Sequence, residues 1–522
     1  QLDINGTPAT IECEPYDSLL HLLRGQGLIS VRYGSDTGET GASAVLVDGR
    51  LVNSDCMLAA QADGHEVTTI EAFNEAELHP IQAAFVATGA MQSGYSTPAC
   101  ILGTWALLRD DPNPSEAAIR DMLSGILDRE TAYVKPVEAI KRAAAVMAGH
   151  DVDPFGPLVL PPLTDGRNPV DVAPDDQPPD ASPAVPRLIP SRDVPEMAVV
   201  GKPEVKVDAI RLAKGNPAFT DDFAERGQLE ARVLRSPHAH ARIVDIDDSA
   251  AVALPGVRAV LHFKNVPRIK YASGGQSWPN PHPYDKVSFD NKVRHFGDRV
   301  AAVAADTSAI ADEALRLIDV TYEVLPAVFD ELEAIEPGAP VIHDEEDTTH
   351  IHDRARNIVH HIGAERGDTE AGFAAADHVF EQTFRVHQVQ QVPIENHISV
   401  AWLDADERMV VRTATQVPFH ARRMLAPLIG MDIKDVRVIK PRIGGGFGAK
   451  QEMLIEDIAA HLAIATRRPV KLELNREEEF MSSRTRHPQT LVYKTGVNND
   501  GTLVSQSLRL IGNTGPYGTH AY

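Results

Sequence analysis

A glycine-rich segment has the clearest chemical potential in this chain: residues 442–450, Arg-Ile-Gly-Gly-Gly-Phe-Gly-Ala-Lys. It follows an apolar run at 436–439 and precedes residues 452–466, whose apolar spacing predicts a helix. Glycines allow backbone N–H groups to approach a ligand closely, and the beginning of a helix stabilises negative charge. The segment therefore predicts a site for an oxyanion or a phosphate-bearing cofactor. A purely structural bend between strand and helix is the alternative.

Other common catalytic patterns are not legible in the sequence. The glycine-rich segment lacks the phosphate-binding pattern Gly-x-x-x-x-Gly-Lys-Ser/Thr. It also lacks the dinucleotide pattern Gly-x-Gly-x-x-Gly followed by an acid about 20 residues later. No Ser-His-Asp or Cys-His arrangement indicates nucleophilic catalysis.

Composition limits the classes of protein that the chain can represent. The 522 residues include 50 Lys and Arg against 74 Asp and Glu, a net charge of −24, which argues against a nucleic-acid surface or an anionic membrane surface. No apolar run approaches the roughly 18 residues of a membrane span, and the first residues lack a signal-peptide pattern. We therefore expect a cytoplasmic, multidomain protein. Its 3 cysteines exclude a disulfide framework and a four-cysteine iron–sulfur cluster within this chain.

The pattern along the chain predicts an α+β multidomain fold. Asn5-Gly6 and Asp48-Gly49 indicate hairpin turns near the N-terminus. Between 151 and 205 lie 13 of the 37 prolines, which predicts an extended linker. The expected parts, in chain order, are a small sheet clasping one helix (1–75), a helical bundle (76–150), the linker (151–205), a mixed α/β domain (206–335) and a further α/β region (336–522).

The glycine-rich segment and its neighbours resemble the molybdopterin-binding part of the xanthine dehydrogenase and aldehyde oxidoreductase family of molybdenum hydroxylases. The segments that carry the resemblance are 234–243, 295–303, 415–420, 442–452 and 513–518, together with residues 1–150. The resemblance implies a ferredoxin-like β-grasp domain, a four-helix iron–sulfur domain and a hammerhead-like first α/β domain. It implies that 336–522 is the N-terminal part of the molybdopterin-binding domain.

The same resemblance implies which residues contact the cofactor and the substrate. By this resemblance, Gln416 would be the catalytic residue and would donate a hydrogen bond to an oxygen on molybdenum. The metal's oxo or sulfido ligand and the pterin would be contacted by Gly445, Gly446, Phe447 and Gly448. The substrate would be bound by Gln451 and Glu452. For the last pair, capping of a helix N-terminus is the alternative. Eukaryotic xanthine dehydrogenases carry a purine-binding glutamate where this chain has Gln451.

The N-terminal domains depart from the family pattern, because all eight cysteine positions of its two [2Fe–2S] clusters lack a thiol here. The residues at these positions are Ser35, Thr40, Ser43 and Asp55 for the first cluster, and Ser93, Ser96, Asp128 and Glu130 for the second. We therefore expect a molybdenum cofactor, as molybdopterin or its dinucleotide form, and no [2Fe–2S] cluster in this chain. FAD, if used, would lie on another subunit.

The resemblance also implies partners. The family's catalytic glutamate and its arginine-bearing substrate loop correspond to sequence after Tyr522, so we expect a second chain to supply the rest of the molybdenum domain. A separate iron–sulfur and flavin subunit would then accept the electrons. The other expected partner is a small-molecule substrate.

Several further residues are weaker candidates. Glu395 would lie near the site or serve as a buried structural acid. Trp278 would line a substrate funnel or pack in a surface loop, and His487 is expected to pack. A group of four histidines would suggest a metal site, but the acidic run at 344–347 indicates a solvated loop there. These histidines are His350, His352, His360 and His361.

Three functions remain open from the sequence. The first is a molybdenum hydroxylase that oxidises a purine-like or other N-heterocycle, or an aldehyde, with water as the oxygen source. The second is a non-redox molybdoenzyme, such as a hydratase, hydrolase or transhydroxylase, which the loss of cluster ligands favours. The third is a catalytically silent scaffold subunit, against which Gln416 and the intact glycine-rich segment argue.

Overall fold

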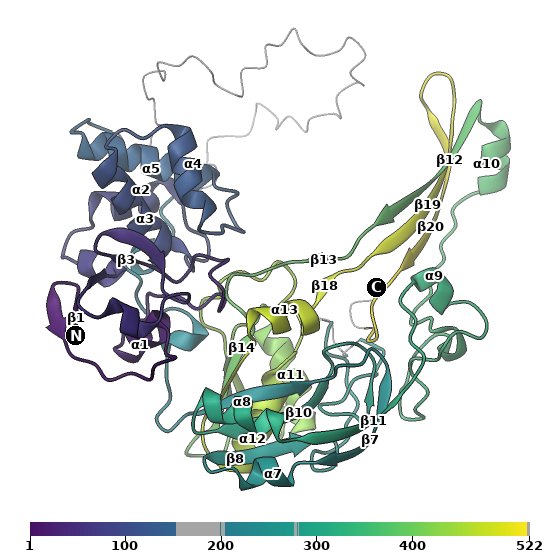
Figure 1. Ribbon diagram of the computed structural model, residues 1–522. Helices are drawn as coiled ribbons and strands as arrows, with labels where there is room; N and C mark the ends of the chain where they lie inside the picture. The colour runs from purple at the N-terminus through teal and green to yellow at the C-terminus, as the bar shows by residue number, and fades with distance from the viewer. Residues whose placement is uncertain (153–198, 200–203, 276–278, 280, 519–522) are drawn as a thin grey trace. The chain divides into compact units, whose positions relative to one another are not determined.

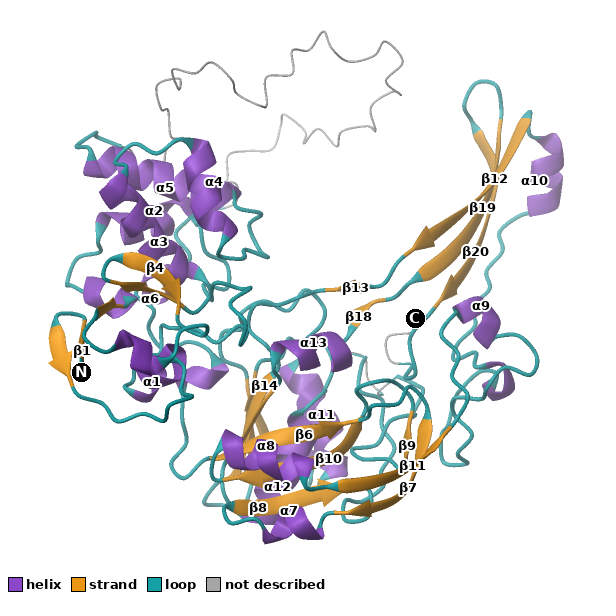
Figure 2. Cartoon of the chain, viewed as in Figure 1, coloured by secondary structure: helices purple, strands orange, loops and turns teal. Residues whose placement is uncertain are grey.

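The computed structural model describes residues 1–152, 199, 204–275, 279 and 281–518. The chain forms two compact units (Figure 1): unit 1 comprises 1–33 and 37–216, and unit 2 comprises 34–36 and 217–522. Both units combine helices and strands (Figure 2), as the α+β prediction requires. The expected linker lies almost entirely outside the described residues, and so does Trp278.

Unit 1 begins with a five-stranded sheet of order β2-β1-β5-β3-β4. Its strands are β1 (Leu2–Ile4), β2 (Thr7–Ala9), β3 (Ala44–Val47), β4 (Arg50–Asn53) and β5 (Glu66–Thr68). Asn5 and Asp48 adopt positive φ values of 54° and 48° in the β1–β2 and β3–β4 turns, so both predicted hairpins are confirmed. Helix α1 (Leu19–Gly25) begins at Ser18, whose side chain accepts a hydrogen bond from the His21 amide, and it buries four leucines.

The rest of unit 1 is helical. Its helices are α2 (Pro80–Thr88), α3 (Thr97–Asp110), α4 (Glu116–Ser124), α5 (Val134–Met147) and α6 (Ala209–Ala213). Pro80 occupies the first turn of α2, where a missing N–H has no consequence. The Gln82 side chain donates to the Ala213 carbonyl at 3.2 Å, so α6 packs in unit 1 although its residues were assigned to the next domain.

Unit 2 is built on a seven-stranded sheet of order β16-β15-β14-β17-β6-β10-β8. The strands are β6 (Leu229–Arg235), β8 (Val257–His262), β10 (Arg299–Ala305), β14 (Ile398–Leu403), β15 (Met409–Thr413), β16 (Val436–Ile439) and β17 (Val470–Glu473). β17 pairs parallel with β6, with Val470 opposite Leu229. The sheet therefore crosses the predicted boundary at 335, and one hydrophobic core lies beneath strands from both sides of it.

Several helices of unit 2 pack on strands of this sheet, and a smaller sheet has the order β11-β7-β9. The helices are α7 (Ser249–Ala253), α8 (Ser308–Arg316), α9 (Glu331–Ala334), α10 (Thr369–Ala375), α11 (Pro418–Leu428), α12 (Glu456–Thr466) and α13 (Arg476–Ser482). The smaller sheet contains β7 (Ala241–Asp247), β9 (Lys292–Val293) and β11 (Asp319–Val324), and a two-stranded ribbon joins β13 (Val389–Gln390) to β18 (Thr485–Arg486).

A long three-stranded sheet extends from the ribbon (Figure 1). It contains β12 (His378–Val386), β19 (Gln489–Val497) and β20 (Leu503–Gly512), and α10 packs on one side of it. Alternate residues place Phe380, Phe384, Leu508 and Leu510 on the opposite side, where they are 62%, 45%, 47% and 48% exposed. We call this apolar side the outer sheet face.

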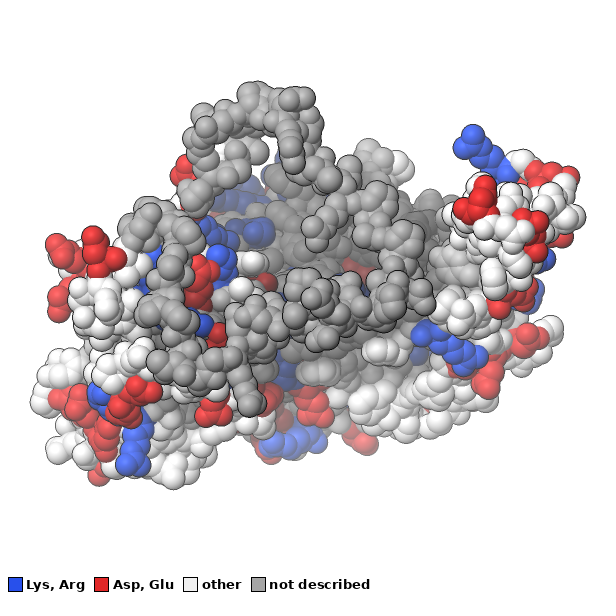
Figure 3. All heavy atoms as spheres, turned by 90° about the horizontal axis from the view of Figure 1, so that it is seen from above, with Lys and Arg blue, Asp and Glu red and all other residues white. Residues whose placement is uncertain are grey.

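The lengths of the helices and the distribution of surface charge agree with two expectations from the composition: no membrane span and no extended basic surface. Among the described residues, none of the helices has the length and apolar character that crossing a bilayer requires. In Figure 3, acidic and basic side chains of the described residues are interspersed on the visible face, without a continuous basic patch.

Candidate functional site

Three neighbouring strands bring the predicted site residues together at one edge of the seven-stranded sheet. β15 and β16 are parallel, with Arg412 opposite Ile439, so the segments that follow them emerge side by side. β14 is antiparallel to β15, so the residues before β14 lie at the same edge. This topology places Gln416, Glu395 and the glycine-rich segment together.

Gln416 is held by the glycine-rich segment through two hydrogen bonds. Its backbone N–H donates to the Lys450 carbonyl at 2.8 Å, and its side-chain Oε1 accepts from the Gly448 N–H at 3.0 Å. Because a backbone N–H requires an acceptor, this contact fixes the orientation of the carboxamide. Its Nε2 has no hydrogen-bond partner among the described residues, so this donor is available to a ligand.

The backbone of the glycine-rich segment is closely shaped around Gln416. Gly445 and Gly448 have φ values of 96° and 99°, which favour glycine. A Cβ atom at Gly446 would lie 2.5 Å from Gln416 Oε1, and one at Gly445 would lie 2.9 Å from the Phe447 ring. Phe447 itself has a φ of 52° and is 37% exposed. The glycines therefore allow Gln416 and Phe447 to approach the backbone.

Below the turn lies a buried ion pair. Lys450 Nζ lies 2.9 Å from Glu395 Oε2, and the two side chains are 0% and 2% exposed. The same carboxylate oxygen accepts from the Gly444 N–H at 2.7 Å, so the pair joins the two ends of the turn. Burial raises the pKa of Glu395, and the Lys450 charge opposes that rise. Glu395 therefore has the surroundings of a buried structural acid, one of the two roles expected for it. Its ion-pair partner, Lys450, was not among the candidate residues that we identified from the sequence.

A second buried pair supports the end of the turn. His397 Nδ1 lies 2.8 Å from Glu479 Oε1, and His397 Nε2 lies 3.3 Å from the Ala449 carbonyl. Burial raises the pKa of Glu479, but the charge and hydrogen bonds of His397 lower it to about 2. The sequence contained no signal for this pair, because its members are 82 residues apart.

The helix after the glycine-rich segment begins later than we expected. α12 begins at Glu456, not at 452. The Glu456 carboxylate accepts from the backbone N–H groups of Leu454 and Ile455 at 3.0 and 3.1 Å, and these bonds form a separate turn before the helix. The prediction of a helix dipole directly behind the glycines was therefore wrong.

The two predicted substrate residues have different surroundings. The buried Glu452 carboxylate accepts from Ser273 Oγ at 2.7 Å and pairs with Arg484 Nε at 2.5 Å. Gln451 is half-buried, and its side chain makes no hydrogen bond within the described residues. Glu452 therefore links the turn to the rest of unit 2, whereas the Gln451 carboxamide is available to a ligand.

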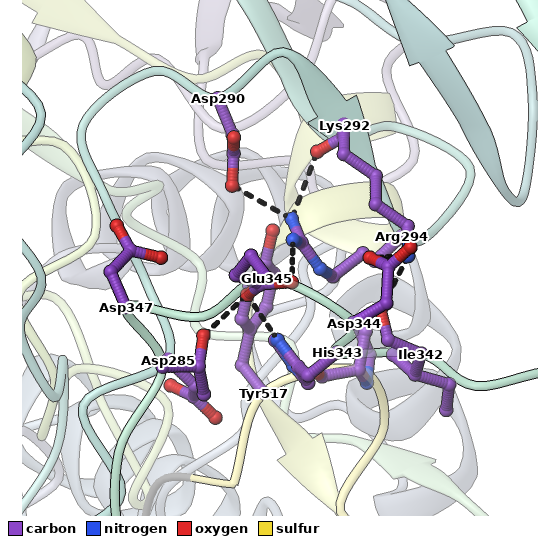
Figure 4. Close-up of polar contacts among 12 residues, drawn as sticks. Asp285, Asp290, Lys292, Arg294, Ile342, His343, Asp344, Glu345, Asp347 and Tyr517 are labelled. Atoms are coloured by element: carbon purple, nitrogen blue, oxygen red, sulfur yellow. Dashed lines mark hydrogen bonds and ion pairs between the residues drawn. The ribbon is translucent and has the colours of Figure 1, made fainter. Parts of the chain in front are cut away.

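In the acidic run at 344–347, Asp344, Glu346 and Asp347 are exposed, as expected for a solvated loop, but Glu345 turns inward (Figure 4). Glu345 is 14% exposed and lies 2.8 Å from each of Lys270, Arg294 and His343. Burial raises the pKa of Glu345, but the hydrogen bond to His343 and the charge of Arg294 lower it well below its usual range. Glu345 thus anchors this exposed loop to buried cationic side chains, and His343 Nε2 donates to the Pro516 carbonyl at 2.6 Å.

The four candidate histidines near this network do not converge. His350 stacks on His282 with ring centroids 3.6 Å apart, and the rings of His352 and His361 lie 5.5 Å apart. Within the described ranges, no group of three or more His, Cys, Asp or Glu side chains has metal-binding geometry. His487 lies half-buried between β18 and β19.

In unit 1, hydrogen bonds link residues at the expected cluster positions. Ser43 Oγ donates to Asp55 Oδ1 at 2.7 Å, and the Ser93 N–H donates to Glu130 Oε2 at 2.6 Å. Asp128 accepts from the Glu130 N–H at 2.8 Å. Glu130 thus connects the two loops that carry the second set of positions.

We predict that Glu130→Ala lowers the free energy of unfolding by about 1–3 kcal/mol, because it leaves the Ser93 N–H without its acceptor. Denaturant titration measures the change. The control is Glu138→Ala, which removes an exposed ion pair with Lys135 and should change stability by less than about 0.5 kcal/mol. Equal effects of the two substitutions would contradict the prediction.

The geometry at the sheet edge fits a cofactor that carries oxygen ligands. Gln416 Nε2 is a free donor, and the N–H groups of Gly445 and Gly446 also donate to no group among the described residues. The glycines allow Gln416 and Phe447 to lie against this backbone, where an added Cβ would collide with them. Together these features suit an oxygen-rich metal centre bound by hydrogen bonds from the protein.

Comparison with protein families identifies three matching regions. Residues 351–522 match the molybdopterin cofactor-binding domain, and residues 214–326 match the a/b hammerhead domain of aldehyde oxidase and xanthine dehydrogenase. Residues 69–141 match a [2Fe-2S] binding domain. The last match concerns a region in which the expected cluster positions carry no cysteine.

Individual relatives agree with these domains. The chain is 37% identical to "Probable hypoxanthine oxidase XdhD" of Escherichia coli K12, over 99% of this chain and 54% of that protein. It is 35% identical to the nicotinate dehydrogenase large molybdopterin subunit of Eubacterium barkeri, over 62% of this chain and 72% of that protein. The structure of the Desulfovibrio gigas aldehyde oxidoreductase superposes with a TM-score of 0.81 at 27% identity, over 96% of this chain and 52% of that one. The chain thus spans about half the length of XdhD and of the D. gigas enzyme.

Proposed function

Because this chain belongs to the xanthine dehydrogenase and aldehyde oxidoreductase family of molybdenum hydroxylases, we propose that it forms part of the active site of an enzyme that hydroxylates an electron-poor carbon. The substrate is a purine-like or other N-heterocycle, or an aldehyde, and water supplies the oxygen. The observation that carries this proposal is the Gln416 carboxamide: the Gly448 N–H orients it, and its Nε2 has no partner among the described residues.

The glycine-rich segment and Gln416 are the proposed cofactor contacts. A bound molybdopterin supplies Lewis-acid and redox chemistry at molybdenum. Gln416 Nε2 donates to an oxygen ligand of the metal and orients it. The backbone N–H groups of Gly445 and Gly446 add two donors whose positions are fixed before the ligand arrives, so no reorganisation is needed. Phe447 and Gly448 complete the contact surface.

Gln451 is the proposed substrate contact. A carboxamide can donate to a heterocycle carbonyl and accept from a ring N–H, whereas a carboxylate only accepts. Glu452, held by Ser273 and Arg484, maintains the turn from which Gln451 projects. Recognition of a purine-like ring by Gln451 agrees with the name of the E. coli relative, a probable hypoxanthine oxidase.

The route of electrons distinguishes hydroxylation from the non-redox alternative. We propose that this chain contains no [2Fe–2S] cluster, since it has 3 cysteines and carboxylates or hydroxyls at the cluster positions. Hydroxylation then requires iron–sulfur and flavin groups on another subunit. A hydratase, hydrolase or transhydroxylase would need none, and the same observation favours it as the second candidate.

The outer sheet face supports a proposal about the missing part of the site. Phe380, Phe384, Leu508 and Leu510 present an apolar surface of the kind that packs against another chain segment. We propose that the polypeptide corresponding to the unmatched half of the relatives packs there and completes the molybdenum domain. This polypeptide is either further sequence of the same protein or a second chain.

We predict about one molybdenum per copy of this chain in the purified assembly, with iron only on other subunits. Elemental analysis of the assembly and of this chain after separation tests both statements.

Gln451→Ala should raise KM about tenfold, because the substrate loses one or two hydrogen bonds, and it should leave the molybdenum content unchanged. Absence of molybdenum would overturn the proposal, and turnover without any electron acceptor would favour the non-redox enzyme.

A further inference from the structure

Unit 2 contains a small cavity that the proposed chemistry does not use. Charged groups dominate its lining: Arg235, Lys286, His295, Asp298 and Arg299. It has room for about one water-sized species. These five residues come from β6, β10 and the loops before β9 and β10, so packed elements hold the cavity in place.

Lys286 is the exceptional member of this lining. The residue is 8% exposed, and its Nζ lies 5.2 Å from the centre of the Tyr517 ring. The ammonium group has no hydrogen-bond acceptor and no ion-pair partner among the described residues. Burial lowers the pKa of Lys286 to about 7, and the nearby charge of Arg299 acts in the same direction.

The acidic groups nearby are already engaged. Asp298 accepts from Tyr517 Oη at 2.7 Å and from the backbone N–H groups of Arg294 and Arg299 at 3.0 Å each. Arg299 pairs with Asp457 at 2.6 Å. The carboxylates therefore leave the Lys286 charge without a direct partner.

Arg235 is a second cationic residue in the lining of the same cavity. Its Nε lies 3.0 Å from Glu478 Oε1, but its Nη2 is buried without a hydrogen-bond partner. Two cationic side chains thus line a space of about one water molecule. A water molecule would satisfy their hydrogen bonds but would not neutralise their charge, whereas an anion does both.

We propose that this cavity binds one small monovalent anion, of the size of chloride, between the Lys286 ammonium and the Arg235 guanidinium. The space, about that of one water molecule, matches a monatomic anion. The inference concerns a site separate from Gln416 and the glycine-rich segment, and it stands independently of the proposed function.

Binding must depend on pH, because only the protonated amine attracts the anion. With a pKa of about 7 in the anion-free protein, Lys286 is about nine-tenths protonated at pH 6 and about one-tenth at pH 8. Apparent affinity should therefore fall about tenfold between these pH values. The charged and titratable groups that face Lys286 are Arg235, His295, Asp298, Arg299, Glu452, Arg484 and Tyr517.

Chloride-35 NMR of the full chain tests the proposal. Protein-dependent line broadening at pH 6 should saturate with added chloride, be displaced by bromide, and weaken about tenfold at pH 8. Lys286→Met should abolish the saturable component. Lys264→Met, which removes an exposed ion pair with Asp245, should leave it unchanged.

Crystals soaked in bromide provide an answer that does not depend on a variant. An anomalous peak between Lys286 and Arg235 is the expected result. A water molecule at that position, or equal saturable broadening in the wild type and Lys286→Met, would overturn the proposal. If Lys286→Met does not fold, the bromide experiment on the wild type decides.

Discussion

Replacing Lys450 by methionine is expected to lower the free energy of unfolding by about 3–5 kcal/mol, the typical effect of removing one member of a buried ion pair. The substitution leaves Glu395, which is 2% exposed, buried without its cation, so the acid must either bear an uncompensated charge or take up a proton. It also loosens the turn, since Glu395 Oε2 binds both Lys450 and the Gly444 N–H. Denaturant unfolding of the full chain measures the change, and loss of molybdenum from the assembly should accompany it.

A double substitution distinguishes the loss of the Lys450–Glu395 ion pair from the loss of side-chain packing at residue 450. Lys450→Met combined with Glu395→Leu removes both charges, so it should be less destabilising than Lys450→Met alone. Arg408→Met is the matched control, because Arg408 pairs with Asp404 at the surface and its removal should change stability by less than about 1 kcal/mol. A Lys450→Met protein within about 1 kcal/mol of the wild type would contradict the role of the pair.

Gly446→Ala is expected to reduce turnover about 100-fold or more, because displacement of a positioning group by about 1 Å has effects of this size. The new Cβ atom would lie 2.5 Å from Gln416 Oε1 and must move the carboxamide. Gly446 has no positive φ, so the effect arises from this contact and not from backbone strain. Steady-state kinetics of the assembled enzyme, with molybdenum content measured in parallel, test the prediction.

The control for Gly446→Ala is Gly363→Ala in the same unit, where no atom lies within 4 Å of the added Cβ. That variant should retain wild-type turnover. Gly446→Ala combined with Gln416→Ala relieves the contact, so thermal stability should recover while turnover stays low. Recovery of turnover in the double variant would show that Gln416 does not position the reacting groups.

Local elements were predictable where short-range chemistry decides them. Asn5-Gly6 and Asp48-Gly49 form their turns because both require a positive φ. Helix α2 begins at Pro80, because proline suits the first turn of a helix. The start of α12 was missed, because the Glu456 side chain caps the preceding turn, which propensity does not encode.

The sequence by itself determined the family resemblance, the α+β class and the identity of the glycine-rich segment, since glycines and motif spacing are local properties. The tertiary structure alone decided which side chains support that segment. Glu395 and Lys450 are 55 residues apart, and Glu452 and Arg484 are 32 apart, and only the strand order brings each pair together. The same holds for β6 and β17, whose parallel pairing joins two predicted domains in one sheet. Ion pairs and strand partners depend on which residues become neighbours in space, and a local residue pattern does not indicate neighbours that are distant in the sequence.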